Sequence, residues 1–307
     1  MGHRKIILLI FLLVRVMLFS QQDPMYSMYM LDKMLINPAF AGSANWAVAT
    51  IKHRQQFVGL NGHPSSGTLN FHAPIQKKHL GFGLKIINDK IAVQTSIHMA
   101  GIISYHLNFA GGKLSSGIEF GFNNRRINYT SLVVNKQGDA ALPPNAMAAT
   151  VPDASYGFYY QKKQFYAGFS QYHILQKRFN FTPTSSAHLY RHFYFLAGNV
   201  YKLSTHFTVE PSLLIKCQNA AKIQIDLNAT VYYNDVIGLG LQLRTKESFI
   251  VFLKISVSEN FKIAYAYDHT VSKLGLYSKG SHELIISYAI KLPPPPSQKE
   301  IHPRYYF

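Results

Sequence analysis

Short stretches in which apolar and polar side chains alternate recur through most of this chain. Between Ile223 and Tyr233 one face would carry Ile, Ile, Leu, Ala, Val and Tyr, and the other Gln, Asp, Asn, Thr and Tyr. Successive side chains of a β-strand point to opposite faces, so a period of two predicts a strand with one apolar and one polar face. The same pattern is clear in residues 80–86, 114–123 and 248–257. An all-β fold is therefore expected.

About fourteen such segments can be marked along the chain. Most are close to the nine to eleven residues that a tilted strand needs to cross a bilayer. We expect strands at residues 47–57, 66–74, 79–89, 94–108, 112–124, 155–161, 164–174, 188–203, 206–217, 222–233, 236–245, 248–258, 261–270 and 281–291. An even number fits a single-chain bacterial outer-membrane barrel, in which both termini lie on the periplasmic side.

Two observations favour a transmembrane barrel over a soluble β-sandwich, whose strands would also alternate. Beyond the N-terminal apolar segment, no uncharged apolar run approaches the length of a membrane-spanning helix. The connections between the expected strands alternate in length. One set consists of tight turns, and the other set includes the longer connections 59–65, 125–154, 175–187 and 271–280. Residues 245–247 are a short exception in the longer set. Outer-membrane barrels have short periplasmic turns and longer external loops. We therefore predict a transmembrane antiparallel β-barrel over residues 47–291.

Residues 1–20 have the features of a secretory signal peptide. Basic residues at positions 3–5 precede an apolar run from Ile6 to Val14. A run of about nine residues is too short for a transmembrane anchor. The only cysteine, Cys217, does not follow the signal, so neither a lipid anchor nor an intramolecular disulfide is expected. The segment predicts export, cleavage and, for a barrel, the outer membrane.

The next stretch, residues 21–46, is rich in turn-forming residues. Pro38 has a fixed φ and keeps Asn37 extended, and Gly42 permits a positive φ. We expect a tight, structured segment here rather than a helix. An ordinary turn before the first strand is the alternative on local chemistry alone.

Four parts of this stretch carry a family resemblance: Gln21-Gln22-Asp23-Pro24, a Tyr/Met-rich run from Met25 to Met30, Asn37-Pro38-Ala39, and Gly42 after Phe40 and Ala41. Together they resemble the start of mature PorP/SprF proteins, which are outer-membrane proteins of the type IX secretion system of Bacteroidota. The rest of the mature chain resembles that family only in its pattern of short strands. The resemblance implies that the family motif, a plug or docking element, includes Asp23, Pro24, Asn37, Pro38, Ala39 and Gly42.

The resemblance also implies a function that is not catalytic. Members look like components of type IX secretion that help to export a secreted adhesin or hold it at the cell surface, with gliding motility in some organisms. The partners expected from it are that adhesin and other secretion components. A general porin or solute channel is the alternative, because it would share the fold, the signal and the alternation. Lumen-facing Glu119, Glu210, Lys254 and Asp268 fit either a plugged or an open barrel.

The formal net charge of +17 makes nucleic-acid binding worth considering. The basic residues are scattered rather than gathered in one stripe, and an exported chain does not meet chromosomal DNA, so we exclude that class. A basic outer face instead favours lipopolysaccharide or acidic proteins as partners. Adjacent basic residues at 125–126, 162–163 and 177–178, near the predicted membrane borders, could contact lipid phosphates, with ordinary solubilising turn residues as the alternative.

We expect no enzymatic activity, no cofactor and no metal site. The fourteen histidines are dispersed, and the chain has no H-E-x-x-H or G-x-S-x-G motif and no phosphate-binding glycine loop. His188 and His192 form the densest pair. On one strand they would share a face, which makes a metal pair geometrically possible, but histidines of a lumen or interface are the favoured interpretation.

Two segments outside the membrane complete the prediction. The longest connection, residues 125–154, is rich in Ala, Pro and Asn and is a natural place for external recognition. Residues 292–307 contain four consecutive prolines, Pro293 to Pro296, which cannot continue a sheet. We expect these residues to form a periplasmic Pro-rich tail, which the prolines would stiffen, with a disordered terminus as the alternative.

Overall fold

The structure is a computed structural model of the chain. It describes residues 23–44, 46–75, 78–129, 145–181, 186–218, 221 and 223–292. The expected signal peptide at residues 1–20 and the prolines of the expected tail lie outside the described residues. So does the middle of the long connection, residues 130–144.

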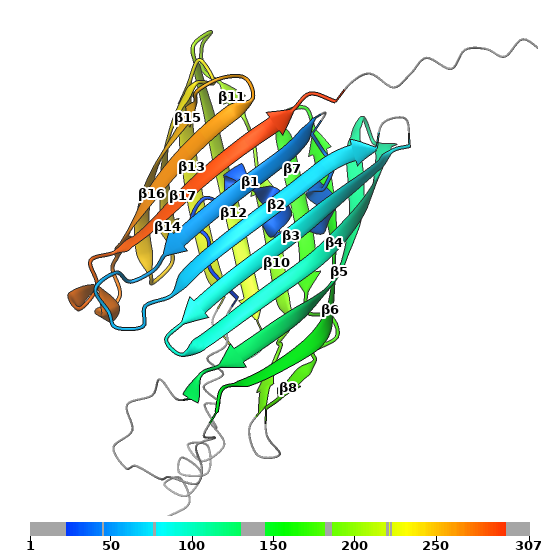
Figure 1. Cartoon of the computed structure of the whole chain (residues 1–307). Coiled ribbons are helices and arrows are strands. Elements are labelled where there is room, and N and C mark those ends of the chain that lie inside the picture. The colour runs from blue at the N-terminus through cyan, green and yellow to red at the C-terminus, as the bar shows by residue number, and fades with distance from the viewer. Residues whose placement is uncertain are drawn as a thin grey trace, which may run out of the picture.

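Fourteen antiparallel strands close into one barrel, which confirms the predicted fold (Figure 1). They are β1 (Ala47–Gln55), β2 (Ser65–Ile75), β3 (Leu80–Ile91), β4 (Gln94–Phe109), β5 (Gly112–Ile127), β6 (Met147–Lys162), β7 (Phe165–Tyr172), β10 (His192–Gly198) with β11 (Tyr201–Lys202), β12 (Phe207–Gln218), β13 (Gln224–Tyr233), β14 (Ile237–Arg244), β15 (Ser248–Ser256), β16 (Phe261–Thr270) and β17 (Ser281–Ile290). Both β10 and β11 pair with β12, so they count as one interrupted strand. The barrel closes because β1 pairs with β17, and β10 pairs with both β7 and β12.

Strand β14 shows why this alternation gives a membrane barrel. Leu239, Leu241 and Leu243 are about half exposed on its outer face, whereas Gln242 and Arg244 are almost fully buried on the inner one. A soluble sheet would turn its leucines inward, because exposing apolar area to water costs roughly 25 cal/mol per Å². The opposite arrangement is favourable only where the outer face meets lipid.

The connections divide the barrel into two ends. We call the end with the connections β5–β6, β7–β10 and β16–β17 the loop end, and the other the turn end. Every connection at the turn end is short, and this end carries the start of β1 and the end of β17 (Figure 1). The loop end has the long loops together with short connections such as β3–β4 and β14–β15. In outer-membrane barrels the longer loops face outward, which makes the turn end periplasmic.

Two of the expected strand boundaries are wrong. β6 begins at Met147 instead of residue 155, because the ends of β5 and β6 extend past the barrel rim, where Ile127, Met147 and Ala149 pack on a small apolar cluster. That cluster includes Phe179 and Ala187, from a hairpin of β8 (Arg178–Asn180) and β9 (Ser186–His188). The expected strand 188–203 is therefore split, with His188 ending the hairpin and His192 starting β10.

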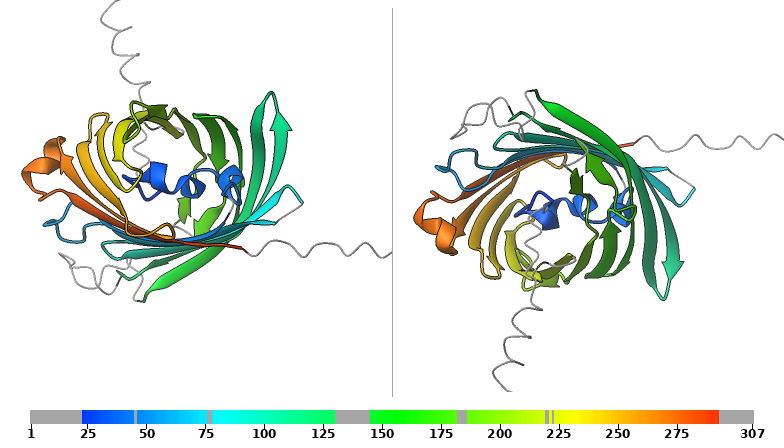
Figure 2. Two further views of the ribbon diagram at one scale, coloured as in Figure 1. Left: turned by 90° about the horizontal axis from the view of Figure 1, so that it is seen from above. Right: turned by 90° about the horizontal axis from the view of Figure 1, so that it is seen from below.

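Residues 23–44 run through the barrel interior as three short 3₁₀ turns, and we call this segment the plug (Figure 2). The turns are η1 (Tyr29–Leu31), η2 (Lys33–Leu35) and η3 (Pro38–Phe40). The plug starts with Asp23 beside the strand ends at the loop end, and Gly42 lies against β2 and β3 near the turn end. A further 3₁₀ turn, η5 (Lys273–Leu276), lies in the β16–β17 loop. Among the described residues, no helix has the length and apolar character needed to cross a membrane.

Candidate functional site: the lumen plug

The middle of the plug is tied to the barrel wall by Asn37. This side chain is 2% exposed, and its Oδ1 accepts a hydrogen bond from the backbone N–H of Ala39 at 3.0 Å, which caps η3. Its Nδ2 donates to the carbonyl oxygens of Phe158 at 2.9 Å and Phe169 at 3.3 Å. Pro38 follows at the first position of the turn, where its fixed φ is already suitable. One amide group therefore shapes the turn and joins it to β6 and β7.

Glycines on the inner faces of the strands make room for this contact. A Cβ on Gly117 would overlap the backbone of Pro38 and Ala39, and one on Gly157 would overlap Oδ1 of Asn37. The same holds for two further wall glycines, Gly81 and Gly168, whereas a Cβ on Gly83 would approach only the end of the flexible Met34 side chain, which can shift. The motif thus packs closer to the wall than any other residue type would allow.

The last motif residue, Gly42, has a φ of +65°, as its sequence position suggested. Its N–H donates to Nδ1 of His72 at 3.3 Å, and a Cβ here would overlap the backbone of Gly81. Just before it, the ring of Phe40 makes an edge contact with Tyr159, at 5.4 Å between centroids. The plug is therefore fixed on two sides near the turn end.

Nearer its start, the plug is held by buried charges from four strands. We call Arg54, Arg244, Asp268 and Glu283 the charge cage; all four are 0–1% exposed. Glu283 accepts the N–H groups of Ser27 at 2.7 Å and Met28 at 3.0 Å. Arg54 donates to Oγ of Ser27 at 2.6 Å and to Asp268 at 2.7 Å.

The cage is completed by Arg244, whose Nη2 donates to the carbonyl of Tyr26 at 2.8 Å. The backbone of residues 26–28 is thus a structural part of an ionic network. A hydrogen bond to a charged group contributes about 1.5–3 kcal/mol. The plug is anchored here as well as at Asn37.

The four residues expected to face the lumen do so. Glu119 pairs with Lys85 at 2.6 Å, Glu210 accepts from the hydroxyl of Tyr166 at 2.7 Å, and Asp268 belongs to the charge cage. Lys254 donates to the carbonyl of Asp235 at 3.0 Å. Each is less than 10% exposed.

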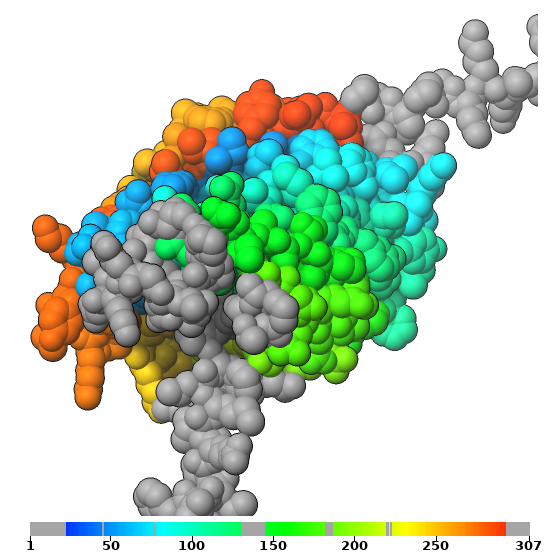
Figure 3. All heavy atoms as spheres, turned by 60° about the horizontal axis from the view of Figure 1, so that its bottom comes forward, coloured from blue at the N-terminus to red at the C-terminus, as the bar shows by residue number. Residues whose placement is uncertain are grey.

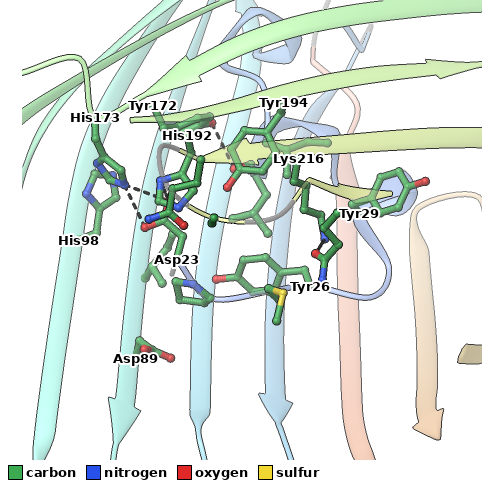
Figure 4. A pocket seen from close by; sticks show the side chains of 18 of the residues that line it. Asp23, Tyr26, Tyr29, Asp89, His98, Tyr172, His173, His192, Tyr194 and Lys216 are labelled. Atoms are coloured by element: carbon green, nitrogen blue, oxygen red, sulfur yellow. Dashed lines mark hydrogen bonds and ion pairs between the residues drawn. The ribbon is translucent and has the colours of Figure 1, made fainter. Parts of the chain in front are cut away.

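The start of the plug meets two histidines at the loop end (Figure 4). The carboxylate of Asp23 lies 2.9 Å from Nε2 of His173 and 3.5 Å from Nδ1 of His192. On its other side, Nδ1 of His173 lies 2.6 Å from Asp153. Asp23 and its neighbour Pro24 border a cavity of about 690 Å³, which is also lined by Tyr26, Tyr172, Tyr194, His98 and Lys216.

The charged groups of this cluster shift one another's pKa values. Burial alone would raise the pKa of Asp23, but the charges of His173 and His192 outweigh burial and hold the pKa well below its usual range. Burial alone would lower the pKa of His173, yet Asp23 and Asp153 raise this pKa to about 10. In the absence of another cation, His173 is therefore charged and sits between two carboxylates.

The six motif residues do not form one compact site. Asp23 and Pro24 lie at the loop end, Asn37-Pro38-Ala39 lies against β5, β6 and β7, and Gly42 lies near the turn end. His188 and His192 do not share a strand face as expected, and His192 meets His173 and Asp23 instead. Arg125, expected near lipid phosphates, places its guanidinium 4.5 Å from the ring centroid of Phe179.

Comparison with known proteins assigns the chain to a secretion system. A family model described as "Type IX secretion system membrane protein PorP/SprF" matches residues 18–288. No curated protein matches the chain.

Three solved outer-membrane structures match the chain at very low sequence identity. The toluene transporter TbuX of Ralstonia pickettii is 9% identical, with a TM-score of 0.51 over 85% of this chain and 93% of that one. The CymD monoaromatic hydrocarbon channel is 9% identical, with a TM-score of 0.49 over 83% and 91% of the two chains. The outer membrane protein Omp33 of Acinetobacter baumannii is 5% identical, with a TM-score of 0.47 over 81% and 100%. At such identities the likeness concerns the barrel fold alone.

Proposed function

Because the chain belongs to the PorP/SprF family of type IX secretion system membrane proteins, we propose that it acts as a plugged outer-membrane barrel that helps to export a secreted adhesin or to hold it at the cell surface. The family and the fold are both of non-enzymatic kinds, and we propose that the protein works by binding. On this proposal residues 1–20 are removed as a signal peptide during export. In organisms that glide, the exported adhesin would take part in gliding motility.

The observation that carries this proposal is the way the plug is built into the wall. The charge cage holds residues 26–28, Asn37 bonds to β6 and β7, and Gly42 packs on β3. Releasing the plug for solute passage would break the hydrogen bonds between residues 26–28 and the charges of the cage, and a hydrogen bond to a charged group is worth about 1.5–3 kcal/mol. A barrel filled in this way suits a scaffold better than a channel.

The loop end offers a surface for the secreted partner. In the β16–β17 loop, Leu274, Leu276 and Tyr277 are 46%, 83% and 71% exposed, and we call them the η5 patch. In Figure 3 the orange β16–β17 loop, which carries the patch, lies at the left, and the green β6–β8 region lies at the right. Exposed apolar groups gathered outside the membrane-spanning strands are typical of protein contact sites. The turn end would then face the other secretion components in the periplasm.

Planar-bilayer conductance separates this function from a general porin or solute channel. We expect purified wild-type protein to give little steady current, and a variant lacking residues 23–44 to give large currents once its barrel folding has been verified by heat-modifiable gel migration. Large, steady currents from the wild-type protein would favour the channel and count against the plugged scaffold.

Capture of the partner tests the binding role itself. Intact protein cross-linked in native outer membrane should recover a secreted surface protein together with type IX secretion components. A Leu276→Arg variant, which places a charge in the η5 patch, should recover less of the secreted protein at an unchanged barrel level. Equal recovery from both proteins would rule out the η5 patch as the contact surface.

A further inference from the structure

The cluster of Asp23, His173 and His192 has the dimensions of a metal site. One donor atom from each of the three lies within 4.8 Å of the others. The carboxylate of Asp23 is 2.9 Å from Nε2 of His173. Zinc bonds of about 2.0–2.1 Å in a tetrahedron place neighbouring donors about 3.3 Å apart, so the Asp23–His173 separation needs little adjustment.

The surroundings of both histidines support a ligand role. Nδ1 of His173 lies 2.6 Å from Asp153, which is the carboxylate–histidine arrangement that orients a metal ligand and leaves Nε2 to coordinate. His192 is 9% exposed, and its Nδ1 donates to the backbone carbonyl of Tyr190 at 3.0 Å. Its Nε2 is buried without a hydrogen-bond partner among the described residues, which leaves this nitrogen to coordinate. A purely structural histidine at this depth would be expected to have both ring nitrogens satisfied.

We propose that Asp23, His173 and His192 bind one divalent transition-metal ion, with Zn²⁺ as the best match. Two imidazoles and one carboxylate are a common zinc ligand set, and three protein ligands leave a fourth position for water or another ligand. That position would face the cavity, which these three residues border. On binding, the Nε2 proton of His173 leaves to solvent, while the Nδ1 proton stays on the bond to Asp153.

Such an ion would connect the start of the plug to the wall. Asp23 belongs to the plug, His173 follows β7, and His192 begins β10. These two strands are paired with each other, so the ion would join the plug to one continuous part of the sheet. It would be a third anchor, at the loop end, after the charge cage and Asn37. The site does not depend on the adhesin role, since it is defined on the isolated barrel.

Metal titration of the untagged, full-length protein tests this site. After treatment with a chelator, we expect Co²⁺ to bind with one equivalent per chain, to produce the strong visible absorption of four-coordinate cobalt, and to be displaced by Zn²⁺. Asp23→Asn and His192→Gln should abolish this signal. Asp153→Asn, which changes only the outer partner of His173, should weaken affinity by roughly 10- to 100-fold.

A second histidine of the same cavity provides the matched control. His98 already has partners at both ring nitrogens, Asn123 at 3.1 Å and Glu119 at 3.1 Å, so His98→Gln should leave Co²⁺ binding unchanged. Heat-modifiable migration verifies that each variant barrel is folded. Absence of the cobalt spectrum in folded wild-type protein would overturn the proposal, as would one-equivalent binding that survives in the Asp23→Asn/His192→Gln double variant.

Discussion

The sharpest test of the plug is the substitution Asn37→Ala. It removes the cap on η3, worth about 1 kcal/mol, and two buried hydrogen bonds to Phe158 and Phe169, worth about 1 kcal/mol each. The docked plug should therefore lose about 3 kcal/mol relative to the released plug. Because 1.4 kcal/mol corresponds to a factor of ten, the population of released plug should rise by about 100-fold.

Thiol labelling measures that population. A cysteine at Ala41, which is 0% exposed, reacts only when the plug leaves the wall, and Cys217→Ser removes the native thiol. When opening and closing are fast relative to labelling, the labelling rate follows the open population, so Asn37→Ala should label about 100-fold faster.

The matched control is Asn124→Ala, which removes one exposed hydrogen bond to Thr150 at the loop end and should leave the labelling rate unchanged. If Asn37→Ala labels less than about fivefold faster than this control, the lost energy is below about 1 kcal/mol. In that case the Asn37 bonds do not hold the plug, and the reasoning above is wrong.

Three further substitutions test other parts of the structure. Gly42→Val, at a φ of +65° and against the backbone of Gly81, should reduce the yield of folded, plugged barrel. The control Gly67→Val should be tolerated, because a Cβ added at Gly67 would meet open space. Equal yields of the two variants would contradict the packing described. Glu283→Ala removes the acceptor of the N–H groups of Ser27 and Met28, each bond worth about 1.5–3 kcal/mol, so the docked plug should lose about 3–6 kcal/mol in the same labelling assay. Glu259→Ala, which breaks only an exposed pair with Lys291, should change little. Leu241→Arg should destabilise the barrel by about 2–4 kcal/mol in denaturant titrations in lipid, because Leu241 faces the hydrocarbon. The control Leu276→Arg, in the η5 loop, should leave barrel stability near that of the wild type. Similar unfolding midpoints for both variants would argue against this lipid-facing surface.

The barrel could be predicted from the sequence because the patterns that indicate it involve residues close together in the chain. Alternation along a strand, as in residues 223–233, and the parity of short and long connections both depend on near neighbours in the chain. The errors arose where a distant packing partner changed a boundary. Residues 147–154 continue β6 because the β8–β9 hairpin packs against the strand ends, and nothing within that stretch alone indicates the hairpin.

The interior was harder to predict because its partners are far apart in sequence. Asp23 and His173 are 150 positions apart, and Ser27 and Glu283 are 256 apart. The polar faces of the strands contained Arg54, Arg244 and Glu283, yet alternation alone cannot say which of them meet. The wall glycines did leave a signal, since Gly81, Gly83 and Gly117 occupy inner-face positions where a side chain would normally fill the lumen. The family motif indicated a plug or docking element, and the closed register of the barrel decides where it lies.

A disulfide that locks the plug tests the central claim most directly. A Cβ built on Gly83 lies 3.4 Å from Cβ of Ala41, close to the separation of about 3.5–4.5 Å found in disulfides. Its nearest neighbour is Sδ of Met34 at 2.9 Å, the end of a flexible side chain that can shift. The Ala41→Cys/Gly83→Cys variant, with Cys217→Ser, should therefore cross-link the plug to β3 in the oxidising periplasm. The measurement is the amount of secreted protein displayed on cells that carry only this variant. A scaffold that works with its plug in place predicts wild-type display; loss of display that a reducing agent restores would show that the plug must leave the lumen.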